Sequence, residues 1–377
     1  MARAMAIRHA GGSEAMATVA IRPKLHERLF EGHHRGFCVL FALAAVEIVA
    51  GIVVGSEPAA SYLLPRDISD TLRFVVPIFI WLAWLAIEAR RETDDIIGYV
   101  RRKAYEQRYW FLRAYIIVML LVPANRAFTA IKVAIPQINP FYADNWLAEA
   151  DRMLFGGVDP WRITHAIIGP TGTLVIDLLY VVWFPIVALL FVWTAFARDP
   201  AFQLRASFTH LGAWAVLGSF MAVMLSSVGP CYMEPLLGDD RFVPLMDRLA
   251  QQQLFAHGAQ EYLLLTLGNE NIGSGISAMP SLHVALAVLL FILCRDQFGR
   301  KHWTSRATLV YAVLIWIGSV HLAWHYALDG IVSAATIILM WQGSKYLVNK
   351  RDSTGSGGAR QADVPAPIIK EPAASVL

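Results

Sequence analysis

Two short segments of this chain place a histidine beside polar or acidic residues at the edge of an apolar stretch. The first is Pro280-Ser-Leu-His283, which runs directly into an apolar, helix-forming sequence. Proline suits the first turn of a helix, because the N–H group that it lacks would have no partner there. Free backbone N–H groups and the positive end of the helix dipole favour anions at such a position. We therefore predict that Ser281 and His283 face a phosphate group.

The second segment is His321-Leu-Ala-Trp-His325-Tyr-Ala-Leu-Asp329. On a helix, His325 and Asp329 are four residues apart and face the same way. A carboxylate bonded to one ring nitrogen fixes the tautomer and leaves the other nitrogen free to attack. His283 would then give a proton to the leaving oxygen. The predicted catalytic groups are thus His325 as nucleophile, Asp329 as its orienting group and His283 as acid, with no metal and no cofactor.

The composition indicates an all-α, polytopic membrane protein. The 377 residues are 56% hydrophobic and only 16% charged, and the mean hydropathy is +0.49. Soluble domains contain about 25% charged residues. The expected partners are a lipid substrate and the membrane, with no nucleic acid; the net charge of +3 adds nothing about partners, and the oligomeric state stays open.

A bilayer core about 30 Å thick needs about 20 apolar residues per helix. This length predicts about eight transmembrane helices, near 36–55, 73–89, 110–134, 173–197, 207–228, 279–295, 307–324 and 328–348. The third is interrupted by Pro123, Asn125 and Arg126, so we expect it to be kinked or to end early. The predicted organisation is a cytoplasmic N-terminal segment, a membrane domain and a disordered cytoplasmic tail, with bounds 1–35, 36–350 and 351–377.

Basic residues gather in every second predicted loop, as the positive-inside rule requires for two cytoplasmic termini. The long loops 135–172 and 229–278 and the His325 end then face the extracytoplasmic side. Loop 135–172 contains an amphipathic stretch that could form a surface helix, either at the lipid interface or packed on the membrane domain. Its predicted apolar face consists of Trp146, Leu147, Met153, Leu154 and Phe155.

Together, the two histidine segments resemble the second and third motifs of the type 2 phosphatidic acid phosphatase superfamily. Those motifs are proline-serine-glycine-histidine and serine-arginine-x5-histidine-x3-aspartate. The Met-Pro-Ser-Leu-His form and the His-Tyr pair look most similar to the branch that contains inositol phosphorylceramide synthase. The resemblance covers about 110–348 and implies a six-helix lipid phosphatase-like core. It also implies a phosphohistidine at His325, oriented by Asp329, with His283 acting on the leaving group.

The chain departs from the family pattern where phosphate is bound. Leu282 stands at the glycine of the second motif, and Gly318 and Ser319 stand at the serine-arginine pair of the third. The first motif, lysine-x6-arginine-proline, should lie near 226–236, where the chain has neither lysine nor arginine. Because a phosphodiester carries one negative charge, it needs less cationic clamping than a monoester. The missing cations therefore favour a transferase or a phosphodiesterase-like relative.

Arg241, or Arg126 in the interrupted third span, is the expected substitute for a missing cation. His321, one helical turn before His325, is expected to cap or hydrate the pocket. The predicted substrate-binding residues are Pro280, Ser281, Leu282, Ser319, His321, Tyr326 and Arg241. The predicted function is that of an integral-membrane lipid phosphatase or phosphotransferase that acts through a phosphohistidine at the extracytoplasmic face.

Other classes of protein stay open at this point. His321, His325 and Asp329 at four-residue steps would also fit a zinc site, and Ser281 would fit an intramembrane serine protease. A transporter or channel would use the polar cluster as its substrate or proton site. Taken singly, each histidine also has a structural explanation, as a helix-start residue or as part of a buried pair. Their joint occurrence on one side of the membrane favours an enzyme, and a transporter or channel is the alternative.

Overall fold

The computed structural model describes residues 25–63, 68–269 and 274–348, and all regular structure within these ranges is helical. Six helices among the described residues are long and apolar enough to cross a membrane. They are α2 (His34–Val54), α5 (Ile96–Ile138), α8 (Pro170–Ala195), α9 with η1 and α10 (Pro200–Gly212, Ala213–Met221 and Ala222–Met224), α15 (Trp303–His321), and α16 with η3 (Ala327–Ser344 and Lys345–Leu347). The predicted all-α, polytopic helical bundle is confirmed.

The other two predicted spans are helical as well. Residues 73–89 lie within α4 (Ile68–Glu92), and 279–295 correspond to α14, which has 17 residues (Leu282–Phe298). The number of eight membrane crossings therefore stays a prediction. Residues 1–24, most of the predicted N-terminal segment, and the predicted tail 351–377 lie outside the described residues.

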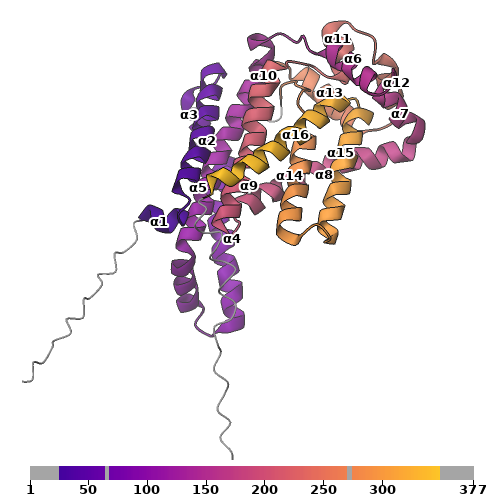
Figure 1. Ribbon diagram of the computed structural model, residues 1–377. Coiled ribbons are helices and arrows are strands. Elements are labelled where there is room, and N and C mark those ends of the chain that lie inside the picture. The colour runs from indigo at the N-terminus through magenta and orange to yellow at the C-terminus, as the bar shows by residue number, and fades with distance from the viewer. Residues whose placement is uncertain (1–24, 64–67, 270–273, 349–377) are drawn as a thin grey trace, which may run out of the picture.

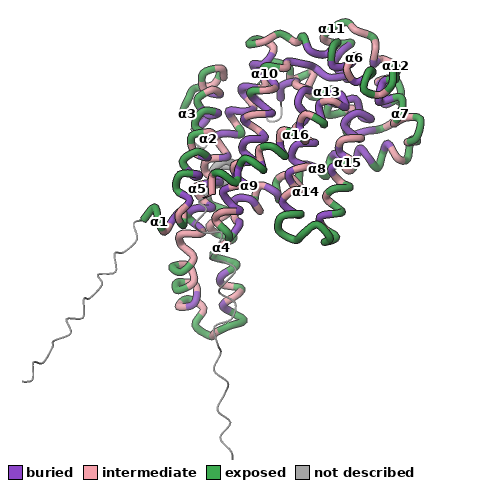
Figure 2. The backbone as a smooth tube through the Cα atoms, in the orientation of Figure 1, coloured by how far each residue is buried: buried purple, intermediate pink, exposed green. Residues whose placement is uncertain are grey.

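Helix α5 is 43 residues long and measures about 65 Å, roughly twice the thickness of a bilayer core. It continues through Pro123 and Pro136, so the third span does not end early; the alternative, a kink at this point, stays a prediction. The basic stretch 101–108, interpreted as a loop, is helical, because arginine, lysine and glutamate favour helix strongly. Figure 1 shows α4 and α5 projecting together beyond the other helices, and Figure 2 shows that much of this projection is exposed.

Proline begins three of the α-helices: Pro160 in α7 (Pro160–Ile167), Pro170 in α8 and Pro200 in α9. Helix α14 begins differently. Its first residue is Leu282, and Ser281 is the N-cap, whose Oγ accepts a hydrogen bond from the Val284 N–H at 3.5 Å. The prediction that Pro280 lies in the first turn is therefore wrong, because a serine hydroxyl is the better cap and the proline ends the preceding loop.

Two apolar clusters hold the bundle together. The larger one joins α8, α14, α15 and α16 to η1 and to the loop helices, and the smaller one joins α2, α5 and α9. The two long predicted loops fold together at one end of the bundle (Figure 1), as α6 (Asp144–Leu154), α7, α11 (Met233–Leu237), α12 (Val243–Ala250) and α13 (Phe255–Leu265). The turns between α4 and α5 and between α14 and α15 lie at the other end.

Helix α6 does not bury the apolar face that its sequence predicts. Trp146, Met153 and Leu154 are exposed, whereas Asp144 and Asp151 are buried together with Leu147. The apolar side is therefore not packed on the membrane domain as a whole, and its place at the lipid interface stays a prediction. The packed side carries the two carboxylates, because backbone N–H groups beneath the helix need acceptors. A buried donor without an acceptor would cost about 1–3 kcal/mol.

Candidate active site

His325 lies in the connection between α15 and α16, two residues before α16 begins. The prediction that His325 and Asp329 share one helix is therefore wrong. The backbone N–H of His325 donates to the Ser319 carbonyl at 3.0 Å, which fixes the turn. Its ring Nδ1 lies 2.7 Å from the carbonyl oxygen of Ala278. Because a carbonyl can only accept, Nδ1 carries a proton, and in the neutral ring the free lone pair is then on Nε2.

Asp329 is fully buried in the first turn of α16. Its Oδ2 accepts the N–H of Tyr326 at 3.1 Å and lies 3.4 Å from Nδ1 of His325. The carboxylate thus caps the helix and places a negative charge beside the imidazole. The closest acceptor for the Nδ1 proton is the carbonyl of Ala278, a contact that motif spacing does not reveal.

His283, in the first turn of α14, lies beside His325, with 6.1 Å between the ring centroids. Its ring stacks on Tyr180 at 4.4 Å and packs against Trp183 at 4.2 Å. The Nε1–H group of Trp183 also donates to the His283 carbonyl at 3.0 Å. Two aromatic side chains of α8 therefore hold this imidazole in place. The structure brings together all three residues that the sequence predicts as catalytic.

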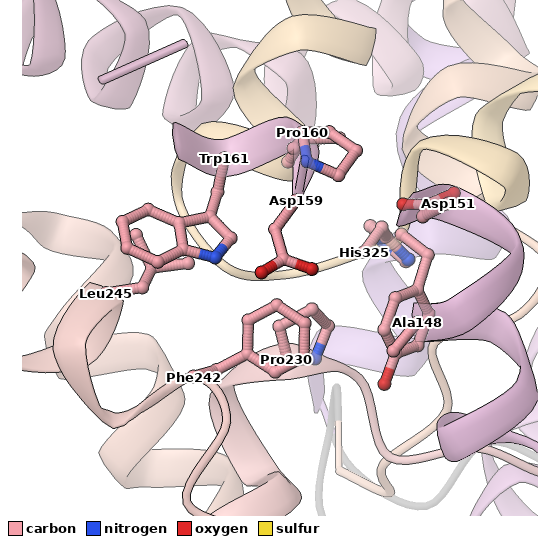
Figure 3. Close-up of a pocket in the computed structure, with 11 residues that line it drawn as sticks. Ala148, Asp151, Asp159, Pro160, Trp161, Pro230, Phe242, Leu245 and His325 are labelled. Carbon is pink, nitrogen blue, oxygen red and sulfur yellow. The ribbon is translucent and has the colours of Figure 1, made fainter. Parts of the chain in front are cut away.

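A small cavity of about 10 Å³ adjoins His325, space for about one water molecule. Figure 3 shows the Asp159 carboxylate pointing into this cavity, with Trp161 on one side and His325 on the other. The lining residues are Ala148, Asp151, Asp159, Pro160, Trp161, Pro230, Phe242, Leu245, Val320, His325 and Tyr326. Asp159 also lines a larger, open cleft of about 510 Å³. The cleft is lined by Glu149, Arg152, Gly157, Val158, Asp159, Arg162 and Arg241.

Neither arginine expected as a phosphate ligand lies at the histidine pair. Arg241 forms ion pairs with Glu149 at 2.7 Å and Asp159 at 2.6 Å, and it lines the open cleft but not the His325 cavity. Arg126 donates to the carbonyl of Ser61 in α3 (Ala59–Leu63) at 2.8 Å. Neither arginine lines the cavity beside His325.

Several predicted substrate-binding residues make framework contacts. The Ser319 hydroxyl is buried and donates to the Trp316 carbonyl at 2.7 Å. The Tyr326 hydroxyl donates to Asp144 at 2.8 Å, although Tyr326 also lines the His325 cavity. Leu282 packs against the larger apolar cluster, and Pro280 is buried beside it. Each of these residues thus has packing or hydrogen-bond partners within the protein itself.

His321 is turned toward α7 and α8. Its Nε2 lies 2.9 Å from the Thr173 hydroxyl, its Nδ1 lies 3.0 Å from the Thr164 hydroxyl, and its ring stacks on His165 at 3.8 Å. Both nitrogens are engaged, so His321 does not join His325 in a zinc site. Within the described ranges, no group of three or more histidine, cysteine or acidic side chains is placed to hold a metal.

The two buried carboxylates of α6 fasten the segments around His325. Asp144 accepts the N–H groups of Val228 at 2.9 Å and Gly229 at 2.8 Å, besides the Tyr326 hydroxyl. Asp151 accepts the N–H groups of Ala327 at 2.6 Å and Leu328 at 2.8 Å, the first two residues of α16. Sequence reasoning missed both carboxylates. Their spacing of seven residues, which puts them on one helical face, was the available signal.

Asp151 should make the stability depend on pH. Burial raises the pKa of Asp151 from 3.8 to about 6, although the N–H groups of Ala327 and Leu328 favour the charged form. Between these values the folded protein holds a proton that the unfolded chain has lost, so stability should fall as the pH rises from about 4 to about 6 and then stay level. The shift corresponds to about 3 kcal/mol.

The free energy of unfolding in detergent, measured from pH 4 to 7, checks this prediction in wild type and Asp151→Asn. The asparagine is neutral throughout, so the variant should lose this part of the decline. Parallel curves for the two proteins would contradict the assignment of the pH dependence to Asp151.

One comparison with known families gives a match to this chain. A sequence profile described as the PAP2 superfamily matches residues 145–342, just over half of the chain. The match includes both histidine segments and most of α6, and it leaves out α2, α4 and α5. No curated protein and no solved structure showed a significant match.

Proposed function

The chain belongs to the PAP2 superfamily, and on that premise we propose that it is a membrane enzyme that cleaves or transfers a phosphoryl group of a phospholipid through a phosphohistidine. The observation that carries the proposal is the pair of imidazoles, His325 with Nε2 free and His283 with its ring centroid 6.1 Å away. Membership of this superfamily favours an enzyme over the transporter or channel that the sequence left open.

In the proposed reaction, Nε2 of His325 attacks phosphorus and the bond to the leaving oxygen breaks as the new P–N bond forms. His283 gives its proton to the leaving oxygen. The Ala278 carbonyl keeps Nδ1–H in place, and the negative charge of Asp329 stabilises the ring as it becomes positive. A water molecule or a lipid hydroxyl then attacks the phosphohistidine, with His283 as base, and His325 is restored.

The absence of the motif cations supports a phosphodiester substrate and a headgroup transferase similar to inositol phosphorylceramide synthase. A monoester dianion would call for the two cations that the motifs lack. The open cleft beside Asp159 provides room for a polar headgroup next to the His325 cavity, and Arg241 is its most constrained cation. In this arrangement Arg241 binds the headgroup and not the reacting phosphate.

We place the site at the extracytoplasmic face and the membrane domain at 36–350, with both termini in the cytoplasm. The basic turns before α5 and between α14 and α15 lie at the end of the bundle opposite to α6, α7, α11 and α12 (Figure 1). The positive-inside rule puts these basic turns in the cytoplasm. The His325 end then faces outward.

A lipid panel tests the proposed function. Purified protein in detergent is incubated, with EDTA present, with phosphatidic acid and with phosphodiester phospholipids, each with and without a lipid bearing a free hydroxyl. Free phosphate and new lipids are measured, and quenched samples are examined for acid-labile label on the protein. Phosphodiester lipids should be used at least as well as phosphatidic acid, and label should be trapped on histidine. The proposal is lost if no phospholipid is turned over and no label is trapped.

A further inference from the structure

Lys132 is a charged residue in an apolar part of α5. Its neighbours Ile131 and Val133 are buried, and Lys132 itself is half-buried. In the part of the chain that the structure describes, its ammonium group has no ion pair and no hydrogen bond. A lysine in a membrane span is costly and marks a functional site when no structural partner satisfies it.

The loop that leads into α14 lies directly on Lys132. Gly275 has a φ of +86°, and a Cβ there would lie 2.9 Å from the Lys132 carbonyl carbon and 3.1 Å from its Cγ. Three residues further on, the carbonyl of Ala278 accepts the Nδ1 proton of His325. The same loop ends at Ser281, the N-cap of the helix that carries His283. One short segment therefore contacts both Lys132 and the nucleophile.

The charge of Lys132 also acts on His283, the proposed acid. Lys132 lies within electrostatic range of the His283 ring, as does His325. The contact with Gly275 thus places Lys132 against the loop that joins the two histidines. By contrast, Arg241 is held by Glu149 and Asp159 in the open cleft.

We propose that the ammonium group of Lys132 binds a nonbridging phosphate oxygen of the lipid substrate at the His283–His325 pair. Lys132 then binds the substrate phosphate in place of the cations missing from the family motifs. It lies on α5, a helix that the family match does not include. This inference rests on the proposed function.

The type of cation bears on the substrate. A lysine presents one compact charge on a flexible stem, whereas an arginine binds two oxygens at once through its planar fork. A single ammonium group balances the single charge of a phosphodiester and leaves a monoester dianion half-neutralised. Lys132 therefore selects phosphodiester lipids.

The test compares Lys132→Met with wild type, because methionine keeps the apolar stem and removes the charge. The variant should lose on the order of 10²-fold in kcat/KM for the best phosphodiester lipid. Inorganic phosphate should compete with that lipid in the wild type, and its Kd, measured by ³¹P NMR in detergent, should rise at least about tenfold in the variant. Because an unpaired charge is removed from an apolar site, Tm should stay equal or rise.

Lys103→Met is the matched control, since Lys103 lies on the projecting half of α5 beside Glu106 at 3.8 Å. It should retain wild-type kcat/KM and phosphate affinity. Unchanged kcat/KM and phosphate affinity in Lys132→Met would overturn the inference, and so would a fall of Tm together with activity, which indicates a structural role. If wild type turns over no lipid but still binds phosphate through Lys132, the proposed function fails and the oxyanion site stands.

Discussion

His325→Asn should lower turnover of the best lipid substrate by at least about 10³-fold without unfolding the protein. Asparagine can place its amide N–H near the position of Nδ1–H and keep the bond to the Ala278 carbonyl, which is 2.7 Å long in the wild type. It has no counterpart of Nε2, so no P–N bond can form. The measurements are kcat, acid-labile label on the protein, and Tm.

A second histidine outside the site provides the control. His257 in α13 is partly exposed and lies 3.5 Å from Glu261. His257→Asn should keep both turnover and label. The nucleophile assignment is wrong if His325→Asn traps as much label as wild type, and a matching loss of Tm would show that the residue acts through the fold.

Asp144→Ala should lower the free energy of unfolding by about 3 kcal/mol or more. The change leaves two buried donors without an acceptor, the N–H groups of Val228 and Gly229, and leaves the Tyr326 hydroxyl with only the sulfur of Met233 at 3.3 Å. Each stranded donor costs about 1–3 kcal/mol. Because Tyr326 directly follows His325, activity should fall as well. Denaturant unfolding in detergent and a turnover assay measure the two effects.

The neighbouring residue Asn145 is exposed on the same helix and gives a matched substitution. Asn145→Ala should change stability by no more than about 0.5 kcal/mol. Equal losses in the two variants would mean that α6 is sensitive to any change, and a loss below about 1 kcal/mol for Asp144→Ala would show that water replaces the carboxylate.

The parts of the fold that depend on local sequence could be predicted. Apolar runs located the long helices, and the two histidine segments met because each adjoins a helix at the same end of the bundle. The helical projection of α5 was not predicted, because charged residues are common in exposed loops and also favour helix.

The contacts that fix the site are non-local, and spacing does not reveal them. The carbonyl of Ala278 reaches His325 across 47 residues, and Asp144 reaches Val228 across 84. The position of Pro280 depends on where α14 begins, which the cap at Ser281 decides. Lys132 could have been singled out, because a lysine within an apolar span is a functional candidate on sequence alone.

The hydrogen bond from Nδ1 of His325 to Ala278 has a consequence for the phosphohistidine of the proposed mechanism. With that nitrogen occupied, the phosphoryl group can be carried only on the tele nitrogen of the imidazole. The pros isomer, a regioisomer with its own NMR signature and faster hydrolysis, is excluded by the backbone. In the proposed mechanism the fold would thereby select the longer-lived of the two phosphoramidates, which would give an acceptor lipid time to diffuse in before water does.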